Sequence, residues 1–69
     1  MVDFMFALYN LDSKKFFRYE NEYRNCVEVD TFIEAITFKT KKEALYTNAM
    51  IKGNYKVIDI YEAIEMNLI

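Results

Sequence analysis

The hydrophobic positions in the first part of the chain fall in short runs, as in a small sheet. Residues 1–10 predict a strand that is covered on both faces, because Phe4–Tyr9 is apolar without alternation. The residues Asn10–Ser13 predict a turn, since their side chains can bond to their own backbone. A second strand is expected over Lys15–Tyr19, so the two strands would form a hairpin.

The middle of the chain is less regular and leaves one alternative open. Residues 20–25 are polar without a period and predict a loop, whereas Cys26–Val29 predicts a short third strand. Asp30 could then cap a single helical turn over Thr31–Glu34. Alternatively, the β-branched residues continue as a strand to Phe38.

The best-marked element is a helix from Thr40 to Lys52. Thr40 and Glu43 match the capping box, in which each side chain accepts from the other residue's backbone N–H. Gly53 suits the left-handed position that follows a helix. Helical spacing joins five positions that we expect to face the sheet, namely Ala44, Leu45, Asn48, Ala49 and Ile51.

The last part of the chain completes the predicted fold. Residues 55–61 predict a fourth strand, and residues 62–69 predict a tail that is either a short helix docked on the sheet or an apolar arm that reaches a partner. We therefore expect one α+β domain over residues 1–69, with the order β-β-β-α-β. Its small, largely antiparallel sheet would pack one face on the single helix and leave some aromatic side chains exposed on the other.

Composition supports a packed core and narrows the chemistry. Of the 69 residues, 54% are hydrophobic and 17% aromatic, more than one small core can hide, so part of this surface is expected to contact a partner. The chain has no His and only one Cys, Cys26, so the usual general base, metal sites and disulfides are missing. We expect no enzyme, no cofactor and no metal. We also expect no signal peptide or membrane span, and a reducing, cytoplasmic setting.

The acidic residues are concentrated in the middle of the chain, which has a net charge of −2 overall. Pairs of acids two residues apart can bind a cation or act as acid and base, but no further ligand set follows them, and solvated surface is the simpler interpretation. An acidic surface with a tyrosine can also bind a protein partner, because aromatic anchors supply affinity and charge tunes the association rate. The predicted partner-binding residues are Glu20, Glu22, Tyr23, Glu28, Asp30 and Glu34.

Three other patterns carry possible chemistry. Tyrosines interleaved with Arg18, Arg24 and Lys56 are typical of a platform that stacks single-stranded nucleobases, although the negative net charge opposes nucleic-acid binding. Lys39, Lys41 and Lys42 surround a helix start, where an anion or an acidic partner could bind. Cys26 follows Arg24 closely, but without a His base we expect it to be a small core or half-buried residue.

Several stretches also carry a resemblance. These are the hairpin residues Ala7–Phe17, and then Ala35–Phe38, Thr40–Ala44, Ile51–Gly53 and Tyr55–Ile58. Together they resemble small accessory proteins encoded by bacteriophages of low-GC Gram-positive bacteria. The resemblance implies no catalytic residues. It implies a protein that binds and modulates or inhibits a host protein, such as a defence nuclease or a replication or transcription factor.

Three functions follow as hypotheses. The first is a host-protein binder that acts sterically or by DNA mimicry through the acidic segment. The second is a single-strand nucleic-acid binder that uses an open sheet face. The third is a structural homodimer without ligand, in which Leu68 and Ile69 pack across a two-fold axis.

Overall fold

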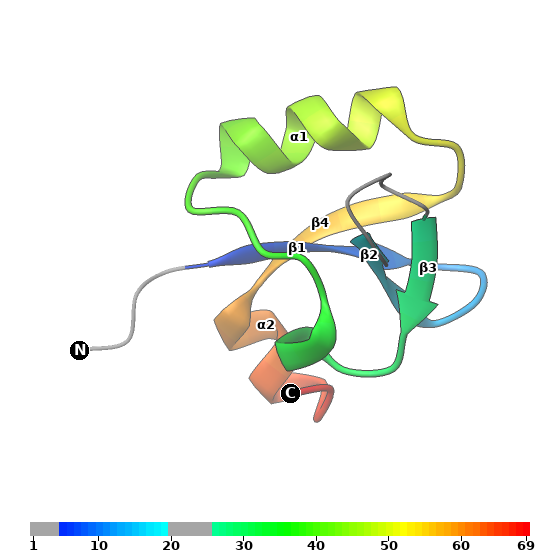
Figure 1. Ribbon diagram of the computed structural model, residues 1–69. Coiled ribbons are helices and arrows are strands. Elements are labelled where there is room, and N and C mark those ends of the chain that lie inside the picture. Colours follow the sequence, from blue (N-terminus) through cyan, green and yellow to red (C-terminus); the bar gives the residue numbers. More distant parts are fainter. Residues whose placement is uncertain (1–4, 20–25) are drawn as a thin grey trace.

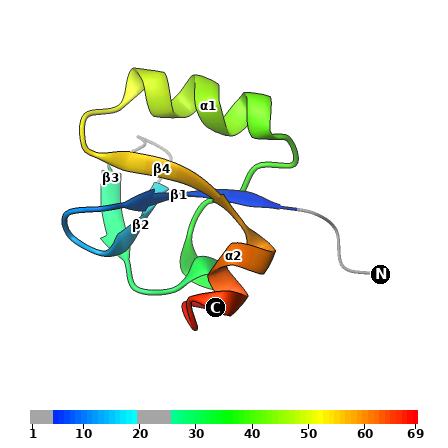
Figure 2. The ribbon, with the colours of Figure 1, turned by 180° about the vertical axis from the view of Figure 1, so that it is seen from behind.

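The fold is a four-stranded antiparallel sheet between two helical layers (Figures 1 and 2). The computed structural model describes residues 5–19 and 26–69. The strand order is β3-β2-β1-β4, which places β1 and β2 inside and leaves β3 and β4 as edges. The α+β class and the β-β-β-α-β order are confirmed. The elements are β1 (Phe6–Asn10), β2 (Lys15–Tyr19), β3 (Cys26–Val29), η1 (Phe32–Glu34), α1 (Lys41–Met50), β4 (Tyr55–Asp59) and α2 (Ile60–Glu65).

The hairpin of β1 and β2 closes through the predicted polar turn. The Asn10 side chain accepts from the backbone N–H groups of Asp12 at 2.8 Å and Ser13 at 3.1 Å. Lys14 adopts a left-handed backbone with a φ of 62°, and its N–H donates to the Asn10 carbonyl at 2.9 Å. These local bonds explain why β2 begins at Lys15, as predicted.

β1 and β2 separate soon after this turn, and a third segment enters between them. The pairing register of the two strands includes only Tyr9 with Phe16 and Asn10 with Lys15. Beyond it, Phe38 exchanges two backbone hydrogen bonds with Phe6, at 2.8 and 2.9 Å. The segment that follows η1 thus completes the hydrogen bonding of the central strand.

Residues 31–34 form the predicted helical turn, which excludes the alternative of a continuous strand to Phe38. Phe32–Glu34 is one turn of 3₁₀-helix, and Phe38 forms only an isolated bridge. The cap of this turn is Thr31 rather than Asp30. The Thr31 hydroxyl donates to the Glu34 carboxylate at 2.7 Å, and this bond joins the first and last residues of the turn.

Both faces of the sheet are covered. On one face, Leu8 and Phe17 pack against Ala44 of α1, and all three are at most 1% exposed. The other face is covered by η1 and α2, so the expectation that this face is partly open is wrong. Its core cluster comprises Ala7, Tyr9, Phe16, Phe32, Ile58, Ile60 and Ala63.

The helix α1 begins as predicted and ends two residues early, at Met50. The Thr40 hydroxyl accepts from the Glu43 N–H at 3.2 Å, which is the first of the two bonds of a capping box. Gly53 does not cap the helix. It lies in the turn towards β4 with a φ of 134°, where a Cβ would come within 2.6 Å of the Tyr55 ring. Backbone conformation and close approach therefore both favour glycine there.

The predicted fourth strand ends at Asp59, because a helix begins there instead. The Asp59 carboxylate accepts from the Glu62 N–H at 2.9 Å, and Glu62 reaches back to the Asp59 N–H at 3.5 Å, which completes a capping box. The following tail is tied to η1, since the Phe32 N–H donates to the Leu68 carbonyl at 2.7 Å. The docked-helix alternative is thus confirmed. Leu68 is partly buried and packs against the core of its own chain.

Candidate functional site

The tyrosines of the sheet belong to the packing of the molecule and form no open platform. Tyr9 is 5% exposed, and its ring centroid lies 4.9 Å from that of Phe16. Tyr19 and Tyr55 pack edge-on against Phe17, with centroids 5.1 and 5.7 Å away. Rings held in this way by their neighbours are not available to stack on nucleobases.

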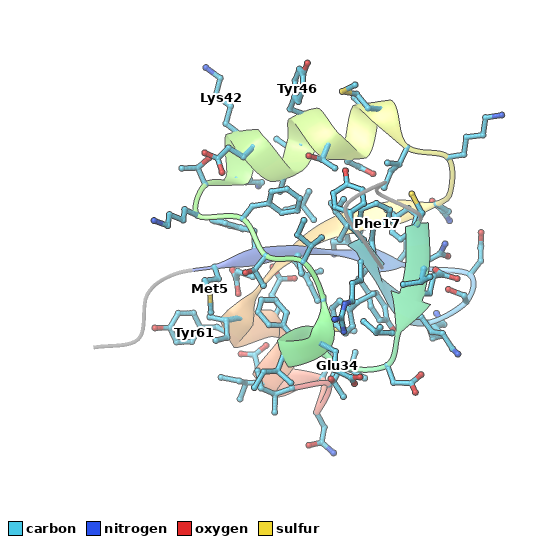
Figure 3. The ribbon with its side chains drawn as sticks, viewed as in Figure 1. Met5, Phe17, Glu34, Lys42, Tyr46 and Tyr61 are labelled. Carbon is cyan, nitrogen blue, oxygen red and sulfur yellow. The ribbon has the colours of Figure 1, made fainter. Side chains whose placement is uncertain are left out.

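The predicted acidic surface is divided between the two sides of the molecule. Glu28 lies on β3 opposite Phe17 and therefore faces the α1 side of the sheet. Glu34 belongs to η1, which covers the opposite face (Figure 3). Asp30 lies at an edge, with its carboxylate 3.7 Å from the Lys15 ammonium group. The other predicted residues, Glu20, Glu22 and Tyr23, lie outside the described residues.

Glu28 has structural partners that the sequence did not suggest. Its carboxylate accepts from the Ser13 hydroxyl at 2.8 Å and from the Tyr55 hydroxyl at 3.1 Å. Burial raises the pKa of Tyr55 above its usual range, and Glu28 raises it further, while the Asn10 side chain lowers it. The carboxylate therefore joins the two edge strands across one face of the sheet.

A hollow of about 480 Å³ lies beside η1 and the end of β2. Its charged residues are Arg18 and Glu34, whose charges have opposite signs. Glu34 already accepts from Thr31, and Ile33 at the rim is 79% exposed. With one charge of each sign, the hollow has no net preference for an anion or a cation.

The outer side of α1 carries the exposed apolar surface that best fits a binding site. The sequence predicted that Leu45 and Ala49 face the sheet, but both are exposed. Only Ala44 is fully buried, and the Asn48 amide donates to the Tyr55 carbonyl at 3.3 Å, which seats this side of the helix on the sheet. The outward positions follow the spacing i, i+3, i+4, i+7, i+8 and form what we call the α1 stripe: Lys42, Leu45, Tyr46, Ala49 and Met50.

Tyr46 and Met50 are each 70% exposed and Leu45 is 49% exposed, and Figure 3 shows Tyr46 and Lys42 projecting away from the sheet. Beside them is a hollow of about 440 Å³, which Tyr46 and Lys42 line together with Phe38. Sequence periodicity missed this surface because α1 carries apolar residues on both sides.

A second exposed apolar surface lies in the opposite layer. We call it the tail patch, and its residues are Ile33, Tyr61, Ile64, Met66 and Ile69, with exposed fractions of 46–79%. Ile33 and Ile69 line a hollow of about 350 Å³ together with Met5. The Ile60 N–H donates to the Met5 carbonyl at 3.0 Å, which places the start of α2 beside this hollow. The sequence indicated an apolar tail, but it did not show that Ile33 joins it.

Neither a metal site among the described residues nor similarity to known proteins indicates a function. Within residues 5–19 and 26–69, no three His, Cys, Asp or Glu side chains are grouped to hold a metal ion, and no helix is long and apolar enough to cross a membrane. Cys26, expected to be a small core or half-buried residue, is exposed. No protein-family model, curated protein or solved structure matches the chain significantly. The exposed apolar surfaces of the described residues are therefore the features that bear on function.

Proposed function

We propose that this chain is a protein-interaction module that binds a host protein in the bacterial cytoplasm and blocks or modulates it through the α1 stripe. The observation that carries the proposal is the exposure of Leu45, Tyr46 and Met50 on the outer side of one helix. Single exposed apolar side chains are common, but a helical stripe of neighbours is the pattern of a helix that docks in a groove. The resemblance to phage accessory proteins supports a host protein as the partner.

The chemistry of the α1 stripe indicates the kind of partner. Tyr46 is the natural anchor, because tyrosine combines a large apolar ring with a polar end and is enriched among the residues that dominate binding energy. Lys41 and Lys42 lie in the first turn of α1 and are exposed. They would favour a partner groove with an apolar floor and an acidic rim, and would speed association with it.

The position of the acidic residues favours a steric mechanism over DNA mimicry. A mimic of DNA presents a continuous row of negative charge, which the described acids do not form. Glu28 is engaged by Ser13 and Tyr55 on one side of the sheet, and Glu34 lies on the other side. This separation of Glu28 and Glu34 supports a contact through α1 rather than through the acidic segment.

The test compares the wild-type chain with two single-site variants. The tagged wild-type chain is used to capture a protein from host lysate, and the captured protein is purified so that its dissociation constant can be measured directly. Tyr46→Ala should weaken binding by at least about 30-fold, as expected for a dominant anchor residue. Tyr61→Ala is the matched control, since it removes a 54% exposed tyrosine from the opposite layer.

Two results would overturn this proposal. In the first, Tyr46→Ala binds the purified partner as tightly as the wild-type chain does. In the second, Asp30→Lys releases the partner while Tyr46→Ala still binds it, which would indicate that the partner contacts the acidic segment instead of α1. Circular dichroism of each variant shows whether the fold is intact.

A further inference from the structure

The two helical layers of this molecule carry opposite charge. Residues 39–53, which include α1, contain four lysines and one glutamate, for a net charge of +3. Residues 31–36 and 60–69, which include η1 and α2, contain three glutamates and no Lys or Arg, for a net charge of −3. The layers lie on opposite sides of the sheet, so the molecule has a basic pole at α1 and an acidic pole around α2 (Figures 1 and 2). Arg18 beside η1 and Lys56 opposite Tyr9 lie on the same sheet face as the acidic pole and offset part of its negative charge.

Each pole has an exposed apolar centre. The basic pole has the α1 stripe, with Tyr46 and Met50 each 70% exposed. The acidic pole has the tail patch, with Ile33 at 79% and Ile64 at 54% exposed, beside Glu65. Because the sheet lies between them, the two surfaces of one chain cannot contact each other.

We propose that the α1 stripe of one copy of this chain docks on the tail patch of a second copy, head to tail. Charge complementarity favours this pairing over a two-fold contact, in which each pole would face its own charge. The tail-patch hollow of about 350 Å³ is within the range of about 300–1,000 Å³ typical of ligand pockets, and it can accept the Tyr46 ring.

The contact is weak, because its exposed apolar centre is small on both sides. A stable interface uses about 20–30 residues on each side, whereas the α1 stripe and the tail patch have five each. We expect a dissociation constant of about 10 µM to 1 mM. Each added copy leaves one α1 stripe and one tail patch exposed, so assembly continues beyond a dimer.

This contact would regulate the proposed function. The self-association itself does not require that α1 binds a host protein, whereas its regulatory effect does. An assembled chain hides its α1 stripe against the tail patch of a neighbour. A host partner that binds the same stripe must therefore compete with self-association. At low concentration the stripe is available, and at high concentration it is partly stored in assemblies.

The test measures the mass of the purified full chain in the absence of any partner. Sedimentation velocity between about 10 µM and 1 mM should show a rising average mass at low salt. The rise should shrink at about 0.5 M salt, since screening weakens charge attraction. Lys42→Glu and Glu65→Lys should each reduce the association at least about 10-fold.

An equimolar mixture of the two variants supplies the decisive measurement. In the mixture, the reversed α1 of one variant faces the reversed tail of the other, and the unchanged α1 faces the unchanged tail. Association should therefore return in the mixture, although each variant alone associates at least about 10-fold more weakly than the wild-type chain. Both reversals place the favoured charge at a helix end, because Lys42 lies in the first turn of α1 and Glu65 is the last residue of α2. Lys14→Glu, in the hairpin turn, is the control and should leave the association unchanged.

A wild-type chain that stays monomeric at about 1 mM and low salt would overturn this proposal. So would a mixture that stays monomeric, or a dimer that only Glu65→Lys disrupts, which would indicate a two-fold contact of the tail patch. These failures differ from failure of the proposed function. Capture of a host partner depends on Tyr46 and should be unaffected by Glu65→Lys.

Discussion

The orientation of α1 on the sheet can be tested with two neighbouring residues. Ala44 is 0% exposed and packs with Leu8 and Phe17, whereas Leu45 keeps 49% of its surface exposed. Ala44→Leu would force a larger side chain into a closed contact, which typically costs about 1–3 kcal/mol of unfolding free energy. This is a large fraction of the roughly 3–5 kcal/mol that a core of this size supplies.

The expected effect of Leu45→Ala is smaller. Full burial of a leucine side chain is worth about 1.5–3 kcal/mol, so the hidden half of Leu45 is worth about 1 kcal/mol. Alanine is also the better helix former, which offsets a few tenths of a kcal/mol. We therefore expect a loss of at most about 1 kcal/mol for this variant.

Urea unfolding followed by far-ultraviolet circular dichroism measures both free energies. The expected order is a clearly lower midpoint for Ala44→Leu than for Leu45→Ala, with similar slopes for both variants. A cost above about 2 kcal/mol for Leu45→Ala, as for a buried leucine, together with a small cost for Ala44→Leu would contradict this orientation of α1. In that case α1 is rotated, and the α1 stripe on which the proposed function depends does not exist.

Two further predictions concern a helix cap and a tyrosine. Asp59→Ala should lower the unfolding free energy by about 1 kcal/mol in urea titrations, more than Thr40→Ala, because Asp59 forms a reciprocal box with Glu62; the reverse order would contradict this. For Tyr55, the raised pKa means that its contribution to stability is present below about pH 10 and is lost as pH rises through that pKa. In absorbance titrations Tyr55→Phe should remove one tyrosine ionisation above about pH 10. Glu28→Gln should shift the ionisation of Tyr55 to lower pH, and no shift would show that the Glu28 carboxylate does not raise the pKa of Tyr55.

Local signals in the sequence were reliable where a short segment satisfies its own backbone. The strands Lys15–Tyr19 and Cys26–Val29 have the predicted bounds, and α1 begins after Thr40 as predicted. The hairpin turn follows from Asn10, whose side chain bonds to the next residues. Such bonds join residues two or three positions apart, so they depend little on the rest of the fold.

Two other local signals in the sequence are compatible with more than one element. Asp59 and Glu62 have the spacing of a capping box, although the apolar run predicts a fourth strand that continues to Tyr61. Gly53 is predicted to follow the end of α1, but it lies in the turn that leads into β4. The apolar run fits both β4 and α2, and the single glycine fits both the end of α1 and the turn into β4. In each case the tertiary contacts of β4 decide between the two elements.

The candidate site depended even more on tertiary structure. Helical spacing could not choose a buried side for α1, because Leu45 and Tyr46 are as apolar as a core-facing residue needs to be. The sheet decides the buried side, because Ala44 packs against Leu8 and Phe17. Closeness in sequence predicts that the acidic residues share one surface, but η1 carries Glu34 to the opposite side of the sheet from Glu28.

The α+β class, the order β-β-β-α-β and the start of α1 were predictable from the amino-acid sequence, because they follow from residue periodicity and from hydrogen bonds between near neighbours. Two features became visible in the packed fold alone: η1 and α2 close the second face of the sheet, and the α1 stripe and the tail patch lie in opposite layers. The physical reason is that burial is shared among segments distant in sequence. Which apolar residues stay exposed is settled only when all the layers have packed together.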